Sequence, residues 1–105
     1  MTNEKCLKEF LNYYKNFQLR LPKAILGSCK SWKDKDKVIF WFQPDGWGDP
    51  SEWGRWLEEV LQKKGWTVID GFNEKKGYWL RARTSSGCEL YVVEDGVEIV
   101  FPSST

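Results

Sequence analysis

Residues 77–101, with the sequence GYWLRARTSSGCELYVVEDGVEIVF, contain two turn signals that divide them into strands and decide the fold. Apolar and polar residues alternate on both sides of Ser85-Ser86-Gly87, as in strands with one buried face. A three-residue hairpin loop there pairs Ala82 with Leu90. A two-residue loop at Ser85-Ser86 would pair Ala82 with Glu89 and reverse the faces, so we reject it.

The second turn signal, Asp95-Gly96, independently predicts the same buried face. A type I′ turn at these two residues pairs Val92 with Ile99 and Leu90 with Phe101. Both turns direct one set of side chains toward the core: Leu80, Ala82, Leu90, Val92, Ile99 and Phe101. Because two independent turns agree, we predict an antiparallel C-terminal meander with strands at 66–72, 77–84, 88–94 and 97–101.

A helix is predicted immediately before the meander. Asp49-Pro50-Ser51-Glu52 combines an N-cap acid, a proline at the first helical position and a capping-box glutamate, and Gly65 suits a left-handed C-terminal cap. Gly54 has low helix propensity, which a close approach to the sheet would compensate. The apolar stripe expected to be buried consists of Trp53, Trp56, Leu57, Val60 and Leu61.

The first part of the chain predicts another helix and two strands. An apolar stripe at helical spacing predicts a helix over residues 3–18, ended by Pro22. Strands are expected at 24–32 and 37–43, around a charged turn at 33–37. The stripe of the helix consists of Leu7, Phe10, Leu11, Tyr14 and Phe17.

These elements predict an α+β fold, a two-layer sandwich in the order α-β-β-α-β-β-β-β with a C-terminal four-strand meander. Both helices are expected to pack on one face of a mostly antiparallel sheet. The chain has 105 residues, so we expect residues 1–105 to form a single domain.

Composition limits the function classes. With 16 Lys and Arg against 15 Asp and Glu, the net charge is +1, which argues against a domain-wide binder of polyanions. There is no histidine, so Ser-His-Asp or Cys-His catalysis and His-ligated zinc are excluded within one chain. We expect no metal and no cofactor, and the sequence favours a protein that is not an enzyme.

The three cysteines, Cys6, Cys29 and Cys88, form no C-x-x-C pair and are odd in number. A disulfide framework is therefore not expected, and a reducing, cytoplasmic location is predicted. Cys6 and Cys88 are expected to be buried and Cys29 to be the reactive thiol. No apolar run is long enough to span a membrane, and no signal peptide is evident, so we expect no membrane association.

The face of the meander opposite the core is the first candidate binding surface. Sheets that carry arginines among aromatic rings bind proteins through hot spots, or single-stranded nucleic acid through stacking. The alternative is a solvated face on which Arg83 pairs with Glu89 and Arg81 lies over Tyr91. The residues predicted on this face are Trp79, Arg81, Arg83, Tyr91, Val93 and Val100, and Trp41 of an earlier strand could join them.

Trp47 is the second candidate. It lies between glycines in the loop at 43–50, where it could anchor a partner or fold back onto the core. With few catalytic groups and 7 Trp, the chain is predicted to be a protein-binding adaptor, inhibitor or immunity-type factor, whose partner is another protein or a second copy. The alternative is a nucleic-acid-binding module that uses the aromatic and arginine face.

Overall fold

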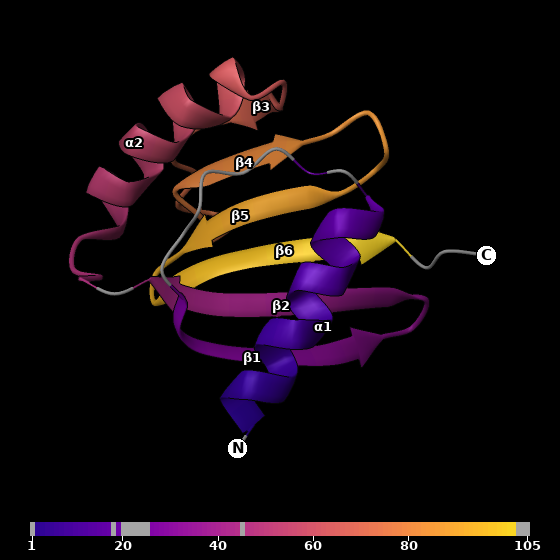
Figure 1. Cartoon of the computed structure of the whole chain (residues 1–105). Helices are drawn as coiled ribbons and strands as arrows, with labels where there is room; N and C mark the ends of the chain where they lie inside the picture. Colours follow the sequence, from indigo (N-terminus) through magenta and orange to yellow (C-terminus); the bar gives the residue numbers. More distant parts are fainter. Residues whose placement is uncertain (1, 18, 20–25, 45, 103–105) are drawn as a thin grey trace.

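The computed structural model describes residues 2–17, 19, 26–44 and 46–102. Within these residues the chain forms two helices and six strands in the predicted order (Figure 1). The elements are α1 (Thr2–Asn16), β1 (Leu26–Asp34), β2 (Lys37–Pro44), α2 (Pro50–Lys63), β3 (Thr67–Asp70), β4 (Leu80–Arg83), β5 (Glu89–Val93) and β6 (Gly96–Pro102). The predicted α+β class and element order are confirmed. Residues 24 and 25, predicted to begin the first strand, lie outside the described residues.

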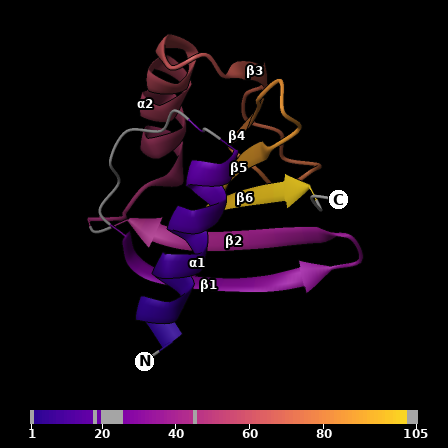
Figure 2. The same cartoon turned by 45° about the vertical axis from the view of Figure 1, so that its right-hand side comes forward.

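The strands form one antiparallel sheet in the order β1-β2-β6-β5-β4-β3. The last four strands run as the predicted meander, and β2 pairs with β6, so the N-terminal hairpin extends the meander (Figure 2). α2 connects β2, which lies next to the edge strand β1, with β3 at the opposite edge of the sheet. The sheet is therefore continuous from one edge strand, β1, to the other, β3.

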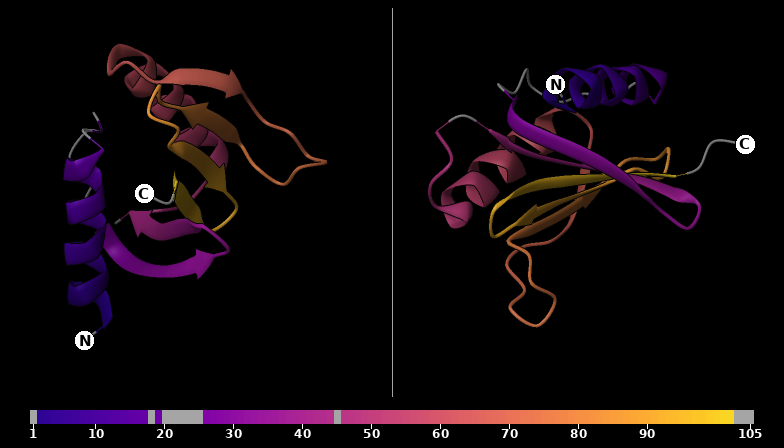
Figure 3. Two further views of the ribbon diagram at one scale, coloured as in Figure 1. Left: turned by 90° about the vertical axis from the view of Figure 1, so that its right-hand side faces the viewer. Right: turned by 90° about the horizontal axis from the view of Figure 1, so that it is seen from below.

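Both helices pack on the same face of the sheet. The Phe10 ring of α1 lies 5.7 Å from the rings of Phe40 and Phe42 and 6.4 Å from that of Phe101. α2 contacts β3, β4 and β5, where Leu61 joins the same buried cluster (Figure 3). Burying these rings and aliphatic chains stabilises the two layers by roughly 1.5–3 kcal/mol for each large side chain.

The β4–β5 hairpin has the predicted register. Ala82 pairs with Leu90, and the three-residue loop ends in Gly87 with φ +94°. A left-handed residue at this place is typical of three-residue hairpin loops, and glycine adopts it without steric penalty.

The β5–β6 hairpin differs from its predicted register by two residues. Val92 pairs with Val97 and Leu90 with Ile99, so Glu94 and Asp95 form the connection. Gly96 is not a turn residue: it lies in β6, where a Cβ would come within 2.6 Å of the Phe42 carbonyl oxygen. The predicted core face nevertheless survives, because a shift of two residues restores each side chain to the same face. All of its members are buried: Leu80, Ala82, Leu90, Val92, Ile99 and Phe101.

α2 begins and ends as predicted but is rotated about its axis. Asp49 caps it by accepting the backbone N–H of Ser51 at 2.9 Å, and Gly65 has φ +91°. The prediction that Trp56 is buried is wrong, because 46% of this residue is exposed. The buried residues are Gly54, Leu57 and Leu61. A Cβ at Gly54 would lie 3.2 Å from the carbonyl oxygen of Trp79, so the predicted close approach of the helix to the sheet is confirmed and turns Trp56 outward.

α1 is likewise rotated slightly from its predicted stripe. Leu11 is 51% exposed, whereas Tyr13 packs against the core, with its ring 5.2 Å from that of Phe101. Neither described helix is long and apolar enough to cross a membrane.

Cys6 and Cys29 form a disulfide that joins α1 to β1, with their Cα atoms 6.2 Å apart. The expectation of no disulfide, and of a reactive Cys29, is therefore wrong. The packing of α1 on β1 brings together two residues that are 23 positions apart, and no sequence motif indicates this. Cys88 is free and fully buried, as expected, and burial raises the pKa of its thiol.

Candidate interaction surface on the open face of the sheet

The face of the sheet opposite the two helices, here called the open face, carries a continuous row of charged and aromatic residues. Its members are direct neighbours on five adjacent strands, from β1 to β4 through β2, β6 and β5. We call it the cross-strand row, and it consists of Lys30, Trp41, Glu98, Tyr91 and Arg81.

At one end of the row, Lys30 and Asp95 hold Trp41. The Lys30 Nζ lies 5.0 Å from the centroid of the Trp41 ring and 5.7 Å from that of Trp32. The indole Nε1 of Trp41 donates to Asp95 Oδ1 at 3.3 Å. The indole also lies over Gly96, since a Cβ there would come within 2.7 Å of Nε1. Trp41 thus has a defined orientation although it is only partly buried.

At the other end, Arg81 is bound to Glu89. Its Nε and Nη2 donate to Glu89 Oε2 at 3.1 and 2.7 Å, and the guanidinium lies 5.8 Å from the Tyr91 ring centroid. The prediction that Arg81 lies over Tyr91 is confirmed. The alternative in which Arg83 pairs with Glu89 is wrong: Arg83 is opposite Glu89 in the register but is exposed, and the carboxylate binds Arg81.

Glu98 lies at the centre of the row, between Trp41 and Tyr91. Burial raises the pKa of its carboxyl group, with a further contribution from Asp95, while Lys30 acts in the opposite direction. Sequence reasoning did not single out Glu98: the predicted β5–β6 register also directs it to the open face, but opposite Val93 and not opposite Tyr91. A correctly assigned Glu94-Asp95 turn would have placed it beside Tyr91.

Tyr78, and not Trp79, lies beside Tyr91, where it is buried. The two tyrosine rings are 5.5 Å apart, and the Tyr78 hydroxyl donates to Asp70 Oδ2 at 2.9 Å. This hydrogen bond lowers the pKa of Asp70, and burial is the main cause that raises the pKa of Tyr78. A bend at residue 79, just before β4, interrupts the strand alternation on which the assignment of Trp79 depended.

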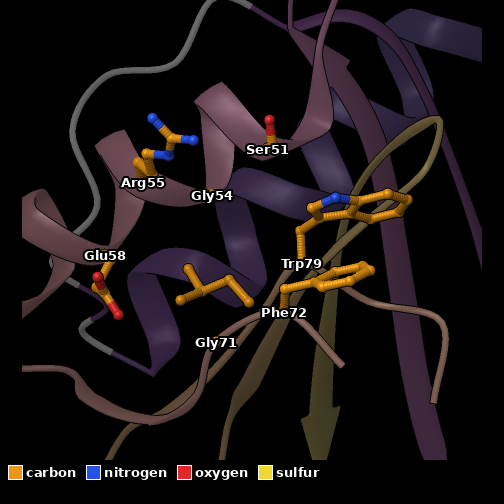
Figure 4. Close-up of a pocket in the computed structure, with 8 residues that line it drawn as sticks. Ser51, Gly54, Arg55, Glu58, Gly71, Phe72 and Trp79 are labelled. Carbon is orange, nitrogen blue, oxygen red and sulfur yellow. The ribbon is translucent and has the colours of Figure 1, made fainter. Parts of the chain in front are cut away.

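Trp79 lies instead on the α2 side, so its predicted placement on the open face is wrong. Its Cβ is 3.4 Å from the position of a Cβ on Gly54, and its ring is 5.3 Å from that of Phe72. The two rings lie side by side near Ser51 and Gly54 of α2 (Figure 4). They line a pocket of about 320 Å³ between the helix and the β3–β4 connection.

Trp47 is also separate from the open face. Its ring stacks on Trp53 at 5.5 Å with an interplanar angle of 19°, and Trp53 in turn meets Trp56 edge-on at 5.5 Å. Trp47 packs against the core cluster, as in the interpretation in which the loop folds back.

The structure therefore brings together three of the six predicted site residues, Trp41, Arg81 and Tyr91, and separates Trp47 and Trp79 from them. The sixth, Arg83, is exposed on β4 two residues from Arg81, opposite Glu89 and outside the row. Among the described residues, no group of three or more Cys, Asp or Glu side chains is placed to hold a metal ion. Comparison of the chain with models of protein families, with curated proteins and with solved structures finds no match.

Proposed function

We propose that this protein acts by binding another protein through the open face, as an adaptor, inhibitor or immunity-type factor without catalytic chemistry of its own. The cross-strand row carries the proposal, because it places Trp, Tyr and Arg, the residues enriched in binding hot spots, on a sheet face that the described helices leave uncovered.

The partial order of these side chains supports the proposal. Lys30 and Asp95 hold Trp41, and Glu89 holds Arg81, before any partner arrives. Side chains that are already oriented lose less rotamer entropy when an interface forms. Partly exposed aliphatic residues adjoin the row and would contribute apolar contact area: Ile39, Val93 and Val100.

A protein partner fits the row better than the alternative of a nucleic acid. Nucleic-acid sites need cations that are free to meet phosphates. In the row Arg81 is bound to Glu89, Lys30 lies over Trp41, and the central position holds the carboxylate of Glu98, which repels a phosphate backbone. The nucleic-acid proposal predicts a salt-dependent mobility shift of labelled single strands at low salt, and the protein-binding proposal predicts none.

Site-specific photo-crosslinking in cells tests the proposal. A photoreactive residue replaces Val100 on the open face and, in a matched control, Leu11, which is 51% exposed on α1. We expect one protein to crosslink at position 100 and not at position 11. We also expect this partner, once purified, to bind the Arg81→Ser, Arg83→Ser double variant at least about tenfold more weakly than the wild type. Equal crosslinking at both positions, or none at position 100, contradicts the proposal.

The redox state of Cys6 and Cys29 indicates the cellular compartment of the protein. The cytoplasmic location expected from the sequence predicts reduced Cys6 and Cys29 in the cell, whereas the disulfide between them is typical of an oxidising compartment. Rapid alkylation of cells before lysis, followed by mass spectrometry of the two cysteines, distinguishes these states.

A further inference from the structure

The cross-strand row has one charged group that its neighbours do not satisfy. Arg81 and Glu89 form an ion pair at 2.7 Å, and the Lys30 ammonium lies over Trp41. The Glu98 carboxylate, in contrast, has no hydrogen bond and no cation within 4.0 Å in the described parts of the chain.

Two aromatic rings flank this carboxylate. Glu98 is the direct cross-strand neighbour of Trp41 on β2 and of Tyr91 on β5. Side chains that face each other in this way have Cβ atoms about 4.5–5.5 Å apart, so both rings are within reach of a group bound to the carboxylate. Every fully buried side-chain oxygen among the described residues has a hydrogen-bond partner. The Glu98 oxygens have none, so they are not fully buried and a ligand can reach them.

A carboxylate between aromatic rings is complementary to an organic cation. An ammonium or guanidinium group would form a charge-assisted hydrogen bond with the carboxylate and lie against the negative faces of the rings. The carboxylate of Glu98 is already partly desolvated in the fold, so it loses less water when a cation binds. The ion pair is therefore stronger than one formed at a fully exposed carboxylate.

We propose that Glu98, Trp41 and Tyr91 form a receptor for one basic side chain, a lysine or an arginine, that a partner protein inserts into the open face. This proposal rests on the proposed function and adds the chemistry of the contact. It also assigns the charged residues different roles: Lys30 and Arg81 orient the rings from the two ends of the row, and Glu98 binds the incoming cation.

Small cationic probes test the receptor without knowledge of the partner. Nα-acetyl-lysine N-methylamide and the arginine analogue are titrated into ¹⁵N-labelled protein, and the norleucine analogue serves as the uncharged probe. The resonances to follow are the indole N–H of Trp41 and the backbone amide of Tyr91. We expect both basic probes to shift them with a dissociation constant on the order of 10 mM, because one ion pair and two ring contacts are all that a single side chain supplies.

Two variants separate the receptor from a general charge effect. Glu98→Gln keeps the shape of the side chain and removes its charge, and we expect it to weaken both basic probes at least about fivefold. Glu94→Gln removes an exposed carboxylate from the β5–β6 connection and should leave the titration unchanged. Absence of any shift, an equal response to norleucine, or equal binding by Glu98→Gln overturns the receptor.

The outcomes also distinguish this proposal from the one on which it rests. If the probes fail and a partner still crosslinks at position 100 in the Glu98→Gln protein as in the wild type, only the basic-side-chain receptor is overturned. If nothing crosslinks at position 100, the proposed function fails as well. If the wild type sediments as a dimer that Glu98→Gln dissociates, the basic side chain belongs to a second copy of this chain, and the assignment to a separate partner is overturned.

Discussion

Replacing Gly96 by alanine tests the contact on which the orientation of Trp41 depends. Gly96 lies in β6, and its backbone conformation is one that alanine can adopt, because its φ is outside the left-handed region. A Cβ at this position would come within 2.6 Å of the Phe42 carbonyl oxygen and 2.7 Å of the Trp41 indole nitrogen. Real Cβ atoms essentially never approach other atoms closer than 3.0 Å, so β2 and β6 have to move apart.

The expected loss of stability follows from two opposing terms. Overpacking a well-packed site costs about 1–3 kcal/mol, and here part of the clash is with backbone that cannot rotate away. Alanine in place of glycine restricts the unfolded chain and returns about 0.4–1 kcal/mol. We therefore expect Gly96→Ala to lower the free energy of unfolding by about 1–2 kcal/mol. The melting temperature should fall by roughly 4–8 °C for each kcal/mol lost.

Urea denaturation of Gly96→Ala and of the matched variant Gly48→Ala measures this effect. A Cβ on Gly48 would meet nothing within 4 Å and its φ is also outside the left-handed region, so Gly48→Ala should be neutral or slightly stabilising. The indole N–H resonance of Trp41 should shift in Gly96→Ala alone, since the added methyl group displaces that ring. Equal denaturation midpoints for the two variants would refute the close contact between β2 and β6.

Trp56→Ala should cost less than about 1.5 kcal/mol because 46% of the residue is exposed, whereas Leu61→Ala on the buried face of the same helix should cost about 2.5–5 kcal/mol in the same assay; similar losses would show that α2 is rotated differently. Replacing Cys6 and Cys29 together by serine should lower the free energy of unfolding by about 3.5 kcal/mol, the value expected for a cross-link over 23 positions, and added reductant should then have no further effect. The pKa of Glu98 is raised above 4.5 in the fold, so the folded state binds this proton more tightly than the unfolded chain does. The stability of the wild type relative to Glu98→Gln should therefore rise as the pH falls from 7 through the raised pKa, and a difference that does not change with pH would count against a desolvated carboxylate.

The fold class followed from the sequence because its signals were local and repeated. Strand alternation has a period of two. A turn misplaced by one residue shifts the register by two, so it left Leu80, Leu90 and Ile99 on the buried face. The cap at Asp49 and the glycine at position 65 are likewise set by neighbouring backbone groups and not by distant parts of the chain.

The rotation of the helix and the composition of the row depend on tertiary contacts, which is why the sequence predicted them less well. The apolar arc of α2 is broad enough to hide either Trp56 or Gly54, and only the close approach to Trp79 decides for Gly54. In the same way, the pair Asp95-Gly96 is typical of a turn. The structure instead needs a glycine at position 96 because the indole of Trp41, from a strand far away in sequence, packs against it. The pairing of Cys6 with Cys29 also requires α1 to be docked on β1.

Gly96 and Glu98 of β6 both adjoin Trp41 of the neighbouring strand, but only Glu98 weakens the fold. Gly96 leaves room for the indole, and alanine in its place is expected to be destabilising. Glu98, two residues later on the same face, lies directly opposite Trp41, and a partly desolvated carboxylate without a partner is unfavourable in the free protein. A departure of this kind from the rules for a stable sheet is expected where a protein binds something, since the ligand supplies what the free protein lacks. We therefore place the binding contact at Trp41 and Glu98, and not at Trp47, Trp53 and Trp56, whose rings contact one another.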